Sequence, residues 1–165
     1  MRIGVPRETK DREFRVGAIP DGVRAIVAAG HEVWVEQGAG EGSGFPDDAY
    51  AAAGAKLVSR DAAWSEPELV VKVKEPSLEE ASRFQSGQTL LTYLHLAAAP
   101  ELTEALRAAD IYALAYETIR HSDGPMASRT VSVVASHPST STPSNSAARF
   151  ASARRRLVDH MQATY

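Results

Sequence analysis

Short apolar segments alternate with amphipathic segments along residues 2–117, and this alternation restricts the possible folds more than any other feature of the sequence. The apolar segments are rich in Val, Ile and Leu, and the segments between them suit helices of about ten residues. Strands that alternate with helices in this way form a parallel sheet with right-handed crossovers. The sequence therefore predicts an α/β fold, with strands at 2–5, 31–37, 56–58, 68–74, 89–95 and 111–117 and helices at 21–30, 46–54, 61–66, 77–85 and 100–109.

The composition changes after Met126 and divides the chain into two parts. Residues 1–126 hold 13 basic and 20 acidic side chains (13 − 20 = −7), whereas residues 127–165 hold five Arg and one Asp, a net charge of +4. The second part is rich in Ser and Thr and lacks Lys, Glu and Gly. We therefore predict a folded domain at 1–126 and a largely disordered tail at 127–165. Out-of-frame translation after a frameshift or a natural disordered extension explains such a tail, and reading the gene in its other frames distinguishes the two.

Several classes of protein are excluded by composition. The chain contains no cysteine, which excludes disulfide frameworks, thiolate zinc sites and cysteine nucleophiles. No apolar run approaches the roughly 18–20 residues that a membrane-spanning helix needs, and no signal peptide precedes the first predicted strand. The net charge of −3 argues against non-specific nucleic-acid binding. We expect a cytoplasmic protein that binds neither membrane nor nucleic acid and holds no metal.

Polar side chains follow four of the predicted strands. The carboxyl ends of parallel strands meet at one edge of a sheet, which is where open α/β sheets bind their ligands. Cations, an imidazole and a carboxylate gathered at one edge suit a small anionic substrate that exchanges a proton. The side chains in question are Arg15, Lys72, Lys74, Tyr93, His95, Tyr116 and Glu117.

Each of these residues also has a purely structural interpretation. Arg15 is either a solvated loop charge or a bidentate ligand for a carboxylate. Lys72 and Lys74 interrupt an apolar strand, so one of them snorkels to solvent or serves function. His95 lies between two leucines and is either a core histidine or an acid–base group, because an imidazole titrates near neutral pH. Glu117 is most simply a loop or helix-start carboxylate.

The glycine-rich segment GAGEGSG at 38–44 does not match the dinucleotide fingerprint G-x-G-x-x-G. If the motif begins with Gly38 and Gly40, its final glycine position holds Ser43. If it begins with Gly40 and Gly42, that position holds Phe45. We interpret the segment as a connection to the next helix.

Six segments together resemble the N-terminal domain of bacterial alanine dehydrogenase, in order and with the expected spacing from residue 1 to about 124. They read MRIGVPRETKDREFRV, GHEVWVEQGAGEGSGFPDDAYAAAGA, VVKVKEP, TLLTYLHLAA, ELTEAL and ALAYETI. The same domain family includes the α subunit of nicotinamide nucleotide transhydrogenase. The resemblance implies a flavodoxin/Rossmann-like substrate domain and the NAD-dependent oxidative deamination of L-alanine to pyruvate and ammonia.

By this resemblance His95 and Lys74 are the catalytic residues. Arg15 and Lys74 then hold the substrate, with Tyr93 and Glu117 shaping the pocket. The resemblance also implies a homo-oligomer, commonly a hexamer.

The resemblance stops near Pro125, before the dinucleotide-binding domain of the family begins. NAD is therefore the cofactor implied by the family, but we expect no binding site for it in this chain. We expect the chain to carry the substrate side only and to be inactive alone. The alternatives are a fragment of the transhydrogenase α subunit and a non-enzymatic remnant or binding module.

Overall fold

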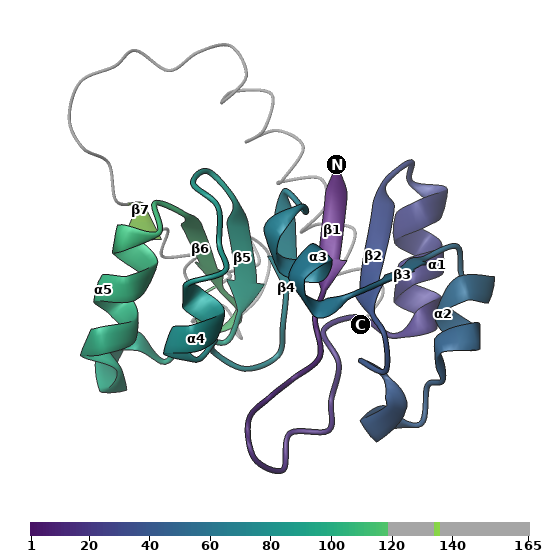
Figure 1. The fold of residues 1–165 in the computed structure, drawn as a ribbon, viewed down its shortest axis with the longest axis horizontal. Helices are drawn as coiled ribbons and strands as arrows, with labels where there is room; N and C mark the ends of the chain where they lie inside the picture. Colours follow the sequence, from purple (N-terminus) through teal and green to yellow (C-terminus); the bar gives the residue numbers. More distant parts are fainter. Residues whose placement is uncertain (119–133, 136–165) are drawn as a thin grey trace, which may run out of the picture.

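The computed structural model describes residues 1–118 and 134–135 of the chain (Figure 1). The described strands are β1 (Arg2–Val5), β2 (Glu32–Glu36), β3 (Lys56–Val58), β4 (Leu69–Val71), β5 (Thr89–Thr92), β6 (Tyr112–Ala115) and β7 (Val134–Ala135). The α-helices are α1 (Pro20–Ala28), α2 (Asp47–Ala52), α3 (Arg60–Ser65), α4 (Leu78–Ala81) and α5 (Pro100–Ala108). Short 3₁₀ turns lie at η1 (Glu41–Ser43), η2 (Leu96–Ala98) and η3 (Tyr116–Thr118). No α-helix in this part of the chain is long and apolar enough to cross a membrane.

The strands form one sheet in the order β3-β2-β1-β4-β5-β6-β7. The first six strands are parallel, with Ile3 opposite Val33 and Leu69 opposite Thr89. This arrangement confirms the predicted α/β fold. β7 pairs antiparallel with β6, an addition that no sequence pattern indicated. Apart from β7, the tail predicted at 127–165 lies outside the described residues.

Both faces of the sheet are covered by helices. Alternate strand residues such as Val5, Val35 and Val71 pack with α1 and α2 in one apolar cluster. The intervening residues, among them Val70 and Leu90, pack with α3, α4 and α5 in a second cluster. Because the central strands β1, β4 and β5 are buried on both sides, they read as nearly continuous apolar runs in the sequence.

β4 ends earlier than the sequence pattern indicates, at Val71 rather than at residue 74. Beyond this point the backbone still bonds to β5, since the Lys72 N–H donates to the Leu91 carbonyl (3.0 Å). On the β1 side, however, the Val73 N–H donates to the Glu8 carboxylate (2.7 Å) instead of to a strand. The Glu8 side chain thus takes the place of β1 as the partner of this backbone. The segment with Lys72 and Lys74 is therefore a connection at the edge of the sheet and not part of β4.

Candidate functional site

The order of the strands reverses between β1 and β4. From β1 the chain continues to β2 and β3 on one side, and it then returns to β4 on the other side of β1. α1 follows β1 and covers one face, whereas α4 follows β4 and covers the opposite face. The connections after these strands therefore diverge, which makes this edge the expected ligand-binding position of a doubly wound sheet.

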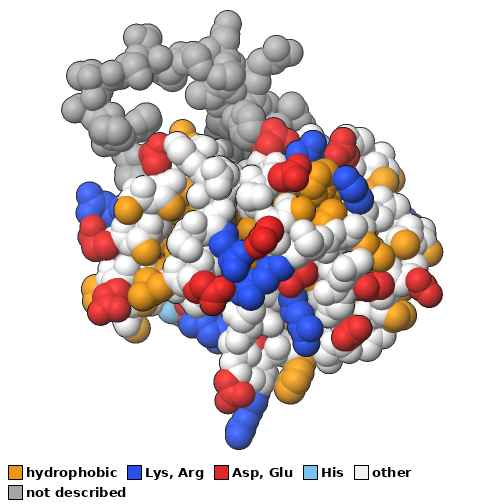
Figure 2. Space-filling model, viewed as in Figure 1, with side chains coloured by type: hydrophobic (Ala, Val, Ile, Leu, Met, Phe, Trp, Pro, Cys, Tyr) orange, Lys and Arg blue, Asp and Glu red, His pale blue; other side chains and the backbone are white. Residues whose placement is uncertain are grey.

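The connection after β1, residues 6–19, projects beyond this edge of the sheet (Figure 1). In the space-filling view the projecting part carries charged side chains of both signs (Figure 2). It returns to the sheet at Gly17, where a Cβ atom would overlap the carbonyl group of Val71. Glycine is therefore required here for the loop to lie against the end of β4.

A buried ion cluster joins this loop to β4 and α4. The Lys72 Nζ lies 3.1 Å from Glu8 Oε2 and 3.3 Å from Glu80 Oε1. The three side chains are only 1–2% exposed. Ammonium and carboxylate groups are costly to remove from water unless they pair with each other.

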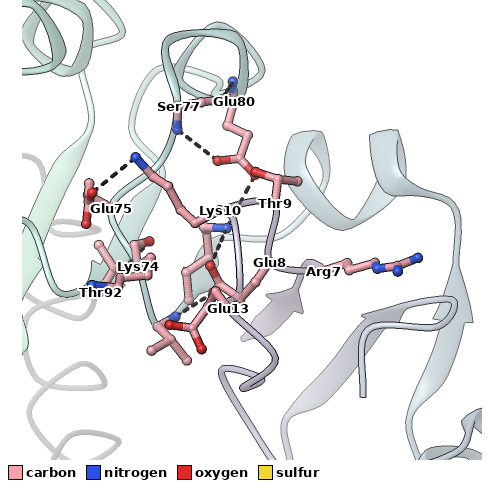
Figure 3. Close-up of polar contacts among 12 residues, drawn as sticks. Arg7, Glu8, Thr9, Lys10, Glu13, Lys74, Glu75, Ser77, Glu80 and Thr92 are labelled. Atoms are coloured by element: carbon pink, nitrogen blue, oxygen red, sulfur yellow. Dashed lines mark hydrogen bonds and ion pairs between the residues drawn. The ribbon is translucent and has the colours of Figure 1, made fainter. Parts of the chain in front are cut away.

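Further bonds complete the cluster. Glu80 accepts from the Thr9 hydroxyl (2.9 Å) and from the Ser77 N–H (2.9 Å), the latter as part of the capping box that begins α4 (Figure 3). Glu8 binds the Val73 N–H, as described above. The cluster therefore fixes the loop of residues 6–19 against the segment that carries Lys74. Of the two lysines, Lys72 is held in this buried cluster.

Lys74 lies at the solvent side of the same segment and is half-buried. Its backbone is held by the Thr92 hydroxyl, which donates to the Lys74 carbonyl (2.8 Å). Next to it, Glu75 pairs with Lys10 (3.1 Å; Figure 3). Burial raises the pKa of Glu75, but the hydrogen bond from Lys10 and nearby charges outweigh it and leave the pKa below its ordinary value.

Arg15 is exposed and forms a bidentate ion pair with Glu13. Its Nε donates to Glu13 Oε1 (2.8 Å) and its Nη2 donates to Glu13 Oε2 (2.6 Å). These hydrogen bonds lower the pKa of Glu13 to about 2, and the charge of Lys74 contributes in the same direction. The bond to Glu13 raises the pKa of Arg15, with a smaller contribution from Tyr93. The pKa of Glu13 therefore depends on both Arg15 and Lys74, although only Arg15 bonds to it.

His95 follows β5 in the left-handed backbone region, with a φ of 48°. Its ring stacks on Tyr93, with ring centroids 6.0 Å apart, and Tyr93 also contacts Tyr116 at 5.1 Å. Glu117 Oε1 accepts the backbone N–H groups of Leu94 and His95, both at 3.0 Å. A non-glycine residue in this region is uncommon and is often found at functional sites.

Glu117 therefore holds the turn that presents the imidazole. Burial raises the pKa of Glu117, but hydrogen bonds from the backbone N–H groups of His95 and Leu94 outweigh it, so the pKa lies below its ordinary value. His95 itself is exposed, not a core side chain. Glu117 lies in the first turn of η3, in agreement with a helix-start carboxylate, and it also bonds the backbone of His95.

The residues singled out in the sequence follow three adjacent parallel strands, β1 (Arg15), β4 (Lys74) and β5 (Tyr93 and His95). Direct contacts join Arg15 to Glu13 and Tyr93 to His95. Sequence reasoning missed three carboxylates, Glu8, Glu13 and Glu80. The only signal for any of them was the Ser77-x-x-Glu80 spacing of a capping box, which predicts a helix start and not a buried ion.

The described residues do not fit the pyrophosphate of a dinucleotide. In the glycine-rich segment, the Gly38 N–H already donates to the Asp47 carboxylate (2.9 Å). The six-residue helix α2 that follows begins with Asp47 and Asp48, whose charges repel phosphate. The connection after β1, where dinucleotide folds bind pyrophosphate, holds Glu8 and Glu13 in place of a glycine turn. Within residues 1–118 and 134–135, no group of three or more acidic or histidine side chains is arranged to hold a metal.

Comparison with known proteins points to one family. The family model "Alanine dehydrogenase/PNT, N-terminal domain" matches residues 4–135. The alanine dehydrogenase of Mycolicibacterium smegmatis is 48% identical over 127 residues, which is 76% of this chain and 34% of the relative. That of Bacillus subtilis is 50% identical over 119 residues, which is 72% of this chain and 32% of the relative. The chain thus spans about a third of the length of these curated relatives.

Solved structures give the same result. An L-alanine dehydrogenase structure superimposes with a TM-score of 0.72 at 54% identity, covering 74% of this chain and 34% of the other. A transhydrogenase structure from Sinorhizobium meliloti superimposes with a TM-score of 0.69 at 28% identity, covering 73% of this chain and 36% of the other. In both solved structures the part that matches this chain is about a third of the longer chain.

Proposed function

Because the chain belongs to the alanine dehydrogenase/PNT N-terminal domain family, we propose that it forms the substrate side of an alanine dehydrogenase that interconverts L-alanine with pyruvate and ammonia. The observation that carries this proposal is that Arg15, Lys74, Tyr93 and His95 follow the adjacent parallel strands β1, β4 and β5, at the edge of the sheet where the strand order reverses. A guanidinium, an ammonium and an imidazole at this edge match a small keto acid.

Each side chain has a distinct task in this proposal. Arg15 binds the carboxylate of pyruvate or L-alanine, because a planar guanidinium pairs with a carboxylate through two hydrogen bonds. Lys74 places a compact positive charge beside the carbonyl oxygen. In the direction of alanine formation, His95 donates a proton to that oxygen as ammonia adds to the carbonyl carbon, so that the oxygen can leave as water. In the reverse direction it takes a proton from the water that adds to the same carbon.

Tyr93 and Glu117 orient the imidazole. The ring of Tyr93 stacks on His95 and limits its rotation, while Glu117 fixes the backbone turn. Groups held in one geometry before the substrate arrives contribute more to catalysis than groups that must be ordered on binding.

The family implies NAD as the hydride acceptor. Since the described residues do not fit its pyrophosphate, we assign this chain substrate binding and proton transfer alone. We expect dehydrogenase turnover to require a nucleotide-binding domain, and holding the two reactants together contributes about 7–11 kcal/mol to lowering such barriers. The cytoplasmic location expected from the composition and the hexameric assembly implied by the family stay predictions.

The identities favour the alanine enzyme over the transhydrogenase α subunit. Relatives that are alanine dehydrogenases share 46–50% of their residues with this chain, whereas the transhydrogenase structure shares 28%. If the chain is instead a non-enzymatic remnant, we expect its site to bind neither pyruvate nor L-alanine.

Titration of the ¹⁵N-labelled chain with pyruvate, and separately with L-alanine, tests the proposal. We expect saturable chemical-shift changes at Tyr93, His95 and the loop of residues 6–19. Arg15→Ala should weaken binding about 10–100-fold, the usual value of hydrogen bonds to a charged group. Arg24→Ala is the matched control, since its side chain is 60% exposed against 63% for Arg15 and lies on α1. A chain that binds neither compound would contradict the proposal.

A further inference from the structure

We propose that Glu13 is a positioning residue that holds one edge of the Arg15 guanidinium and leaves the other edge free for the carboxylate of the substrate. This inference rests on the proposed function, because it assigns the free edge to pyruvate or L-alanine. It adds a residue that sequence reasoning did not find.

The hydrogen bonds define which edge is held. A guanidinium offers two pairs of parallel donors, a side edge formed by Nε and one Nη, and an end edge formed by Nη1 and Nη2. Glu13 takes the side edge, through Oε1 to Nε (2.8 Å) and Oε2 to Nη2 (2.6 Å). Among the described residues Nη1 has no hydrogen-bond partner, so the end edge stays available to a second carboxylate.

Glu13 is itself held by the loop. Its Oε1 also accepts the backbone N–H of Arg15 (3.0 Å), and its own N–H donates to the Lys10 carbonyl (3.1 Å). One carboxylate oxygen therefore ties the Arg15 backbone and side chain together.

The burial of the pair is unequal. The Glu13 side chain is 7% exposed, whereas that of Arg15 is 63% exposed. The carboxylate thus forms the fixed base of the pair, and the guanidinium extends from it towards solvent. This is the arrangement expected of a ligand-binding arginine whose orientation is set in advance, because less side-chain freedom is lost when the ligand binds.

The charge of Glu13 does not cancel the attraction of the site for an anion. Only Arg15 pairs with Glu13, and the charge of Lys74 acts on Glu13 in addition, so these three side chains together carry a charge of +1. Glu8, which also acts on Arg15, is paired with Lys72. We therefore expect the orienting effect of Glu13 to outweigh its repulsion of an incoming carboxylate.

The test uses the full chain and two readouts. The first is the ¹⁵N relaxation of the Arg15 Nε–H group without ligand, which we expect to be as ordered as the backbone in the wild type and mobile in Glu13→Gln. The second is pyruvate affinity, which we expect Glu13→Gln to weaken about three- to tenfold, the value of ordering one long side chain. Glu104→Gln is the matched control, because Glu104 also binds an arginine through both oxygens (3.0 and 2.9 Å), at an exposed site on α5.

The outcomes separate the two proposals. A Glu13→Gln chain that binds pyruvate as tightly as the wild type, or more tightly, overturns the inference. A mobile Arg15 Nε–H in the wild type also overturns it, and this measurement needs no variant to fold. A wild type that binds no pyruvate contradicts the proposed function instead, and the Arg15 relaxation then decides the orienting role of Glu13 alone.

Discussion

Two groups of ion-paired side chains, each with positive and negative members, lie at the same edge of the sheet and differ in their exposure to water. In the first, Lys72 is enclosed by Glu8 and Glu80, and all three side chains are 1–2% exposed. In the second, Arg15 extends into solvent from Glu13. Lys72 has no surface left for a ligand, whereas Arg15 keeps an accessible edge.

The comparison shows that burial decides the role of a charged group here. A buried cluster must satisfy its charges internally, so it connects elements of the fold. An exposed pair contributes little to stability but can exchange or add a partner. Lys72 belongs to the buried cluster, whereas Lys74, two positions further on, is half-buried. The following substitutions test whether burial separates the roles of the two lysines.

The largest effect is expected from Lys72→Met. Removing the ammonium leaves Glu8 buried without a counter-charge and Glu80 with only the Arg60 guanidinium at 3.9 Å, so the free energy of unfolding should fall by about 3–5 kcal/mol. Urea denaturation followed by circular dichroism measures it. Lys74→Met is the matched control and should cost less than about 1 kcal/mol, because Lys74 is only half-buried. Equal losses in the two variants would contradict this separation of roles.

Lys74→Met should instead reduce pyruvate affinity. Loss of a charged group that contacts the ligand corresponds to about 10–100-fold. Isothermal titration calorimetry on the purified chain provides the measurement, with Lys56→Met on the β3 edge as a control of equal charge. Unchanged affinity in Lys74→Met would remove Lys74 from the proposed site.

The Glu13–Arg15 pair should contribute about 1 kcal/mol to stability, in a defined pH range. The pKa of Glu13 is about 2 in the folded chain and 4.5 ordinarily. A lowered folded-state pKa stabilises the fold above pH 4.5, and this stabilisation is lost as the pH falls from 4.5 towards 2. We keep the expected size small because Arg15 is exposed and water screens the pair.

Comparing urea denaturation of the wild type and Glu13→Gln at pH 7 and near pH 2.5 checks this prediction. The difference between the two proteins should shrink at the lower pH. A difference that stays constant would mean that the charge of Glu13 plays no part.

The smallest effect is expected from Glu117→Gln. A glutamine can still accept the Leu94 and His95 N–H groups, so only the contribution of the charge is lost, about 0.5–1 kcal/mol. Amide chemical shifts of Leu94 and His95 should move while those of β1 stay in place. A loss as large as that of Lys72→Met would show that the turn at His95 belongs to the structural core.

Much of the fold was predictable because it depends on local patterns. All six predicted strands and five predicted helices exist, and most of their ends agree within a few residues. Apolar runs, glycines and prolines report directly on burial and turns. The largest differences are at the ends of α4, which stops at Ala81 rather than at residue 85, and of β4 and β5, which each stop three residues early. In β4 the Glu8 side chain takes the place of one neighbouring strand, and a carboxylate 65 positions away in the chain leaves no trace in a local pattern.

The sequence by itself determined the strand and helix order, and with it the edge at which Arg15, Lys74 and His95 would lie, because parallel strands bring their carboxyl ends together. It also determined the family, which the matching family model confirms. The tertiary structure alone decided that Lys72 is enclosed and that Glu13 holds Arg15. The cost of a charge depends on how much water surrounds it, and that is known only when distant segments have packed together.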